Sequence, residues 1–112
     1  VEAAYHSLVR HLQRLTKLRY LLPSAARPHS VKVLMLDEPT AGVSPIVMDE
    51  LFDRIIEVAR TGISILMVEQ NARQALAIAD KGYVLVQGEN RFTDTGANLL
   101  ADPEVRKSFL GG

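Results

Sequence analysis

The sequence contains no cysteine among its 112 residues, which excludes disulfide bonds and thiolate metal sites and fits a reducing compartment. Its apolar runs all fall short of the roughly 20 residues that a membrane-spanning helix needs. The formal net charge is zero, and few aromatic residues lie among the basic ones, so we expect no nucleic-acid partner. These absences together predict a soluble intracellular protein.

Charge is distributed unevenly along the chain. Residues 1–30 hold five Lys or Arg against one acidic residue, whereas residues 31–112 hold eight against twelve. An apolar stripe predicts an amphipathic helix over 1–22, followed by a loop. Its basic face is typical of a solvated surface helix; the alternative is a helix that lies on a partner or an anionic membrane. We therefore expect two parts, 1–30 and 31–112.

Residues 31–112 alternate apolar runs with helical patterns. Two runs, 31–36 and 63–68, are joined by a helical pattern at 46–60, which predicts a βαβ unit with parallel strands. The first run is almost continuously apolar, which predicts a strand buried on both faces. The later patterns predict a helix, a hairpin and two short helices, at 71–79, 83–86 with 91–93, 96–101 and 103–110. The expected fold class is α/β, a parallel sheet with flanking helices and a C-terminal β-hairpin plus short helices.

Two carboxylates, Asp37 and Glu38, directly follow the first apolar run, and Pro39 should end the strand there. At the carboxyl end of a parallel strand such a pair suits phosphoryl transfer, because Mg²⁺ prefers a few carboxylate oxygens and a second carboxylate can accept a proton from water. Solvated charges at the start of a loop would explain an isolated pair. The apolar strand before it and the Pro-Thr turn after it favour a site.

The segment Leu36-Asp37-Glu38-Pro39-Thr40 resembles the Walker B motif of ATP-binding cassette (ABC) ATPases. The segments that follow are similar to the family's D-loop, switch loop and next strand, at 41–45, 68–72 and 80–85. The tail, 99–106 with Phe109-Leu110-Gly111-Gly112, is similar to the C-terminus of ATP-binding subunits of branched-chain amino acid importers. The resemblance covers about residues 31–112, and it implies the C-terminal half of an ABC ATPase domain with a partial P-loop NTPase fold.

The resemblance implies a role for each matching residue. Asp37 would support Mg²⁺, and Glu38 would be the catalytic carboxylate. Gly42, Val43 and Ser44 would contact the nucleotide site of a second ATPase subunit in the ATP-bound dimer. Gln70 stands where most of the family has a histidine, and its amide can donate to the γ-phosphate but carries no charge. Implied as well are ATP as cofactor, integral membrane permease subunits as partners, and a cytoplasmic location on the inner face of the cell membrane.

The family's phosphate-binding loop, G-x-x-x-x-G-K-[ST], has no counterpart, because the sequence contains no Gly-Lys pair. The family's Leu-Ser-Gly-Gly-Gln signature is missing too, and residues 1–30 do not match. A fragment of a longer reading frame, a frameshifted or recombined gene, and a natural short protein are the three explanations. Since phosphoryl transfer depends on positioned phosphates, we expect no nucleotide-dependent stabilisation of the isolated chain.

Two further expectations follow from the missing half. The first strand should find its neighbours in 63–68 and 82–87, or in another molecule, because an exposed apolar edge promotes pairing. Either the N-terminal helix covers the sheet or two chains associate. The alternative function is a non-catalytic α/β interaction module that is unable to bind ATP alone. The transported cargo is not encoded in these residues.

Overall fold

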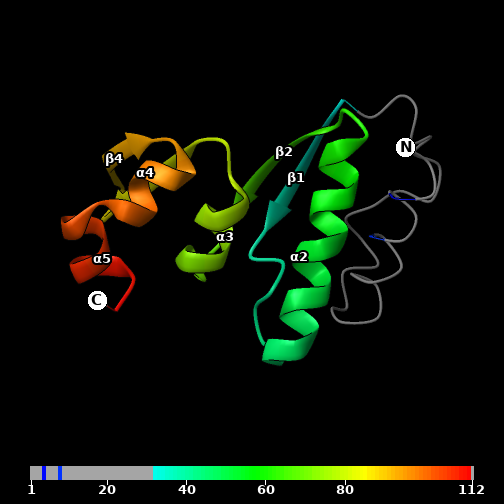
Figure 1. Cartoon of the computed structure of the whole chain (residues 1–112), viewed down its shortest axis with the longest axis horizontal. Helices are drawn as coiled ribbons and strands as arrows, with labels where there is room; N and C mark the ends of the chain where they lie inside the picture. Colours follow the sequence, from blue (N-terminus) through cyan, green and yellow to red (C-terminus); the bar gives the residue numbers. More distant parts are fainter. Residues whose placement is uncertain (1–3, 5–7, 9–31, 112) are drawn as a thin grey trace. The chain divides into compact units, whose positions relative to one another are not determined.

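The computed structural model describes Ala4, Leu8 and residues 32–111 (Figure 1). Most of the N-terminal helix expected over 1–22 lies outside the described residues, as does its predicted packing over the sheet. Ala4 and Leu8 are helical, and Leu8 is fully buried. The chain forms two compact units, residues 1–69 and 70–112.

The first unit is built on a β-α-β connection. Strand β1 (Val33–Asp37) pairs in parallel with β2 (Ser64–Val68), with Val33 opposite Ser64 and Asp37 opposite Val68. Helix α2 (Pro45–Arg60) connects the two strands and runs alongside them in Figure 1. The parallel βαβ arrangement predicted from the two apolar runs is therefore confirmed.

Helix α2 begins and ends where its sequence signals predict. The Ser44 hydroxyl accepts a hydrogen bond from the Val47 N–H at 3.4 Å, and Pro45 occupies the first turn, where its missing N–H has no consequence. The helix ends at Arg60, followed by Gly62 at a φ of +98°. Its buried residues are Leu51, Phe52, Ile55 and Val58.

Strand β1 is buried on one face only, which corrects the prediction of two buried faces. Leu34 and Leu36 are buried, whereas Val33 and Met35 are exposed, Met35 at 74%. Both faces of a strand are buried only where other elements pack on each side of the sheet. The side chains on the Met35 face point away from the core. A nearly continuous apolar run did not distinguish these two cases.

The second unit contains an antiparallel hairpin and three short helices. They are α3 (Ala72–Ile78), β3 (Gly82–Val86), β4 (Glu89–Asp94), α4 (Gly96–Ala101) and α5 (Pro103–Phe109). The turn places Gln87 and Gly88 at φ values of +50° and +78°, as a two-residue hairpin turn requires. Strand β3 pairs with β4, and of the neighbours expected for the first strand, 63–68 is the one seen to pair with it within the described residues.

The core of the second unit is a cluster of Leu76, Leu99 and Val105, against which Val84, Phe92, Leu100 and Leu110 pack. Phe92 and Phe109 meet edge to face with centroids 6.1 Å apart. The Arg73 guanidinium donates to the backbone carbonyl of Leu110 at 2.7 Å, which joins α3 to the end of α5. The predicted C-terminal hairpin with short helices is confirmed.

Candidate functional site

The acidic pair lies at the carboxyl end of β1, as the sequence predicts. Asp37 is the last residue of the strand and is exposed, and Glu38 directly after it is half-buried. Among the residues that the structure describes, no group of three His, Cys, Asp or Glu side chains could hold a metal ion by itself. Mg²⁺ in nucleotide sites commonly takes one or two carboxylates and completes its shell with phosphates and water. Asp37 therefore fits the role of a protein ligand in such a site, but it does not form a complete metal site by itself.

Glu38 has an unusual backbone conformation. Its φ is +46°, in the left-handed region that residues other than glycine seldom adopt. The Glu38 N–H donates to the Val68 carbonyl at 2.7 Å, and the Glu38 carbonyl accepts from the Ala41 N–H at 3.1 Å. Hydrogen bonds on both sides thus hold a conformation that costs roughly 1–3 kcal/mol. Such strain is concentrated at functional sites, which supports Glu38 as a functional residue.

The turn that follows leads into α2. Thr40 is buried, with 3% of its surface exposed, and its backbone carbonyl accepts from the Val43 N–H at 3.3 Å. Gly42 is exposed at a φ of +74°, with open space where a Cβ would stand. The predicted D-loop residues Gly42, Val43 and Ser44 therefore form the exposed or half-buried link between the acidic pair and α2.

Glu69 belongs to this site and was not among the predicted site residues. Its carboxylate oxygen Oε2 accepts a hydrogen bond from the Thr40 backbone N–H at 3.4 Å. The parallel register explains this contact, since Asp37 lies opposite Val68 and the next residues of both strands emerge side by side. The signal in the sequence was a carboxylate directly after the second apolar run.

Gln70 is the first residue of the second unit and is exposed. Its backbone carbonyl accepts from the Ala72 N–H at 2.8 Å, next to the start of α3. Asn71, directly before α3, makes no side-chain cap bond and donates to the Gln74 side chain at 2.6 Å. The helix is also shorter than predicted and ends at Ile78. The proposed role of Gln70 stays a prediction.

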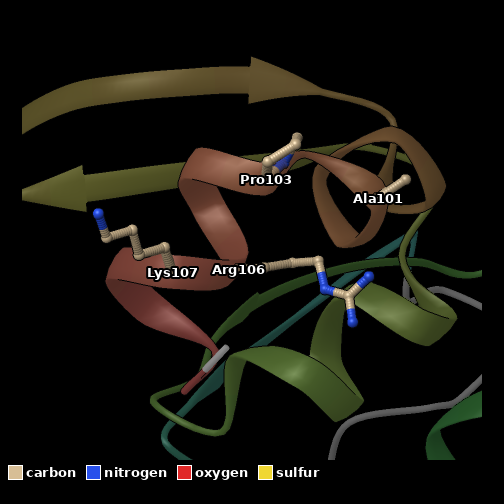
Figure 2. A pocket seen from close by; sticks show the side chains of 4 residues that line it. All are labelled: Ala101, Pro103, Arg106 and Lys107. Atoms are coloured by element: carbon tan, nitrogen blue, oxygen red, sulfur yellow. The ribbon is translucent and has the colours of Figure 1, made fainter.

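A pocket of about 290 Å³ in the second unit lies away from all these residues in the sequence (Figure 2). It is lined by Ala101, Pro103, Arg106 and Lys107, from the end of α4 through α5. None of the predicted site residues is among them. Within the described part of the chain, no helix is both long and apolar enough to cross a membrane.

Comparison with known proteins finds relatives that are named as ATP-binding proteins of transport systems. The high-affinity branched-chain amino acid transport ATP-binding protein BraG of Pseudomonas aeruginosa is 48% identical over 81 residues, which is 72% of this chain and 35% of BraG. The probable branched-chain amino acid transport ATP-binding protein LivF of Archaeoglobus fulgidus is 40% identical over 92 residues, 81% of this chain and 39% of LivF. The lipopolysaccharide export system ATP-binding protein LptB of Escherichia coli is 38% identical over 88 residues, covering 78% of this chain and 35% of LptB.

Solved structures show the same fold. The ADP conformation of MJ1267, an ATP-binding cassette of an ABC transporter, superposes with a TM-score of 0.59 at 23% identity, covering all of this chain and 52% of MJ1267. The structure of cbiO1 from Clostridium perfringens, part of the cbiONQ ABC transporter complex, also gives 0.59, at 21% identity over 96% of this chain and 49% of cbiO1. No family model matches the sequence.

The chain spans little more than a third of the length of the curated relatives described here. The resemblance predicted from the Walker B and later motifs is nonetheless confirmed by sequence and by structure. The chain is similar to ABC transporter ATP-binding subunits, those of branched-chain amino acid transport included, and its fold is part of the ABC ATPase form of the P-loop NTPase fold.

Proposed function

We propose that residues 31–112 supply the metal and water side of an ATP hydrolysis site in an ATP-binding subunit of an ABC importer, with branched-chain amino acids as the cargo. The observation that carries this proposal is the strained, doubly hydrogen-bonded Glu38 directly after the exposed Asp37. The similarity to BraG and LivF supports the cargo class. Residues 1–30 form a separate segment in this proposal.

Each residue of the site has a defined task. Bound Mg²⁺ would neutralise charge on the phosphates of ATP. The exposed Asp37 carboxylate supports the ion, directly or through water, while Glu38 accepts a proton from the attacking water. The left-handed backbone of Glu38 turns the chain out of the strand direction, so the two adjacent carboxylates serve different atoms. Gln70 donates to the γ-phosphate, and Gly42, Val43 and Ser44 contact a second ATPase subunit.

The proposed assembly is a dimer of ATPase subunits bound to integral membrane permease subunits, on the cytoplasmic face of the cell membrane. The phosphate-binding loop has to come from sequence outside these 112 residues, because they contain no Gly-Lys pair. By itself the chain should therefore show no nucleotide-dependent stabilisation. A rise of several degrees in the unfolding midpoint with Mg-ATP would contradict this.

The test places residues 32–111 in a complete subunit, in exchange for the matching segment of BraG. The chimera should hydrolyse ATP, and Glu38→Gln should lower kcat by about 100-fold or more, because the amide cannot accept a proton. The dissociation constant for ATP should stay within about twofold, since Glu38 does not bind the phosphates. Glu89→Gln, at an exposed carboxylate of β4, is the matched control and should change neither quantity.

A chimera that hydrolyses ATP equally well with Gln at position 38 would refute the proposed catalytic role. The alternative, a non-catalytic module, is favoured by the missing phosphate-binding loop. It predicts that Arg14→Glu with Lys17→Glu removes binding of a partner while Asp37→Asn changes nothing. Binding measurements on the full chain and these two variants separate the two functions.

A further inference from the structure

Glu69 makes a contact that joins the end of β2 to the turn after β1. Its Oε2 atom accepts the backbone N–H of Thr40, 29 residues earlier in the chain, at 3.4 Å. Thr40 is almost completely buried, and Glu69 is half-buried. A charged acceptor strengthens a hydrogen bond to a backbone N–H, and a buried N–H without an acceptor is destabilising.

This contact fixes the middle of the turn. The Thr40 N–H is held by Glu69, and the Thr40 carbonyl accepts from Val43. Two residues earlier, the Glu38 N–H is held by the Val68 carbonyl at 2.7 Å. Two consecutive residues at the end of β2 therefore anchor the chain on both sides of Pro39.

The two anchors restrict Glu38 in a specific way. Pro39 between them has a φ fixed by its ring, so little rotational freedom remains in that stretch. Pro39 also disfavours the right-handed helical region for Glu38, which leaves extended conformations as the unstrained alternative. Reaching them requires the chain after Glu38 to change direction, and the bond from Thr40 to Glu69 opposes this.

We propose that Glu69 is a positioning residue that keeps the turn at 38–43 closed and thereby holds Glu38 in its left-handed conformation. The importance of this for catalysis rests on the function proposed above for Glu38. Glu69 touches neither water nor nucleotide in this role; it acts through the Thr40 N–H.

The test uses the full 112-residue chain, labelled with ¹⁵N, in the absence of nucleotide. Two signals are measured: hydrogen exchange of the Thr40 amide, and the NOE between the amide and Hα protons of Glu38, which is strong at positive φ. Glu69→Leu and Glu69→Ala both remove the acceptor, and the alanine variant adds no apolar bulk should the leucine variant fail to fold. Glu69→Gln keeps an acceptor oxygen, and Glu89→Leu is the control at an exposed carboxylate.

In Glu69→Leu and Glu69→Ala, exchange of the Thr40 amide should be faster by about fivefold or more, the effect of losing one ordinary hydrogen bond. The Glu38 NOE should weaken in the same variants and persist in Glu69→Gln and Glu89→Leu. Unchanged Thr40 exchange would overturn the proposal. So would a lower unfolding temperature with an unchanged Glu38 NOE, because Glu69 would then be structural only. As no nucleotide is present, either failure is distinct from a failure of the ATP hydrolysis test.

Discussion

The β1–β2 pair and the β3–β4 hairpin each contain two strands, but their exposed faces differ in composition. In the first pair, the exposed face carries the apolar side chains Val33, Met35, Leu66 and Val68. In the hairpin, the exposed Tyr83 and Leu85 lie opposite Thr93 and Asn90, which are polar. The exposed face of the first pair is therefore apolar along most of its length, with Ser64 and Asp37 as its polar residues.

The two units also differ in how their interactions are distributed along the chain. The core cluster and the bond from Arg73 to Leu110 lie wholly within residues 73–110. In the first unit, the paired strands β1 and β2 are separated in the sequence by the whole of α2. This unit also contains the strained Glu38. The acidic pair thus belongs to the unit with the mainly apolar exposed face. Of the residues proposed for chemistry, Asp37 and Glu38 are in the first unit, whereas Gln70 begins the second.

The largest expected effect tests whether the two faces of β1 differ as described. Leu36 is only 7% exposed, so Leu36→Ala should lower the free energy of unfolding of the chain by about 3 kcal/mol, because removing a buried side chain leaves a cavity. Met35→Ala, at the neighbouring exposed position, should lower the free energy of unfolding by less than about 0.5 kcal/mol. Urea denaturation of both variants measures this. A loss above about 1.5 kcal/mol for Met35→Ala would mean that the face is covered, since exposed sites rarely reach that value.

The second prediction concerns the close approach of α3 and α4 in the second unit. A Cβ at Gly96 would stand 2.3 Å from the backbone carbonyl oxygens of Leu76 and Ala79. Gly96→Ala should therefore lower the free energy of unfolding by about 2 kcal/mol, because backbone atoms have to move. Ala97→Ser, which adds one atom at an exposed position of the same helix, is the control. Equal stability of the two variants would show that α4 can shift freely.

The third prediction tests the strain at Glu38. Glu38→Gly should raise the free energy of unfolding of the chain by about 0.5–1 kcal/mol relative to Glu38→Ala, since glycine adopts positive φ without a steric penalty. Both variants lack the carboxylate, so the difference reports the backbone alone. Denaturant titration of the pair provides the measurement. If alanine proved equally stable, the left-handed conformation would not be strained.

The smallest expected effect is a pH dependence at the junction of β4 and α4. The Asn98 side-chain amide, and then the Thr95 backbone N–H, donate to Asp94 and lower its pKa below the ordinary 3.8. Because the folded pKa is the lower one, this stabilisation is present above pH 3.8 and is lost as the pH falls toward the folded value. Asp94→Asn should remove that part of the acid sensitivity. Unfolding midpoints at about pH 6 and pH 3 compare the variant with the parent, and an equal loss in both would contradict the prediction.

Much of the fold follows from local signals. Ser44 and Pro45 start a helix, Gly62 follows its end, and Pro103 starts α5, because capping and fixed φ act within a few residues. The end of β1 at Asp37 was also predicted, from Pro39. Local signals of this kind do not depend on what packs against the element.

The features that sequence reasoning missed depend on distant residues. The exposure of Met35 depends on whether a second layer covers the sheet, which an apolar run does not reveal. The left-handed Glu38 and the contact of Glu69 with Thr40 arise from the register between β1 and β2. For the candidate site, the acidic pair was predictable and its backbone geometry was not.

The parallel pairing of β1 with β2 has a consequence for how the chain folds. Val33 meets Ser64 only after α2 has formed or collapsed between them, whereas Val86 meets Glu89 across a two-residue turn. Loop-closure entropy makes distant pairings slow, so the hairpin should form first and the parallel pair last. Until then, two segments rich in valine, leucine, isoleucine and methionine have unpaired backbones. Charged residues at the ends of these segments then oppose aggregation during synthesis and refolding. They are Lys32, Asp37, Glu38 and Glu69.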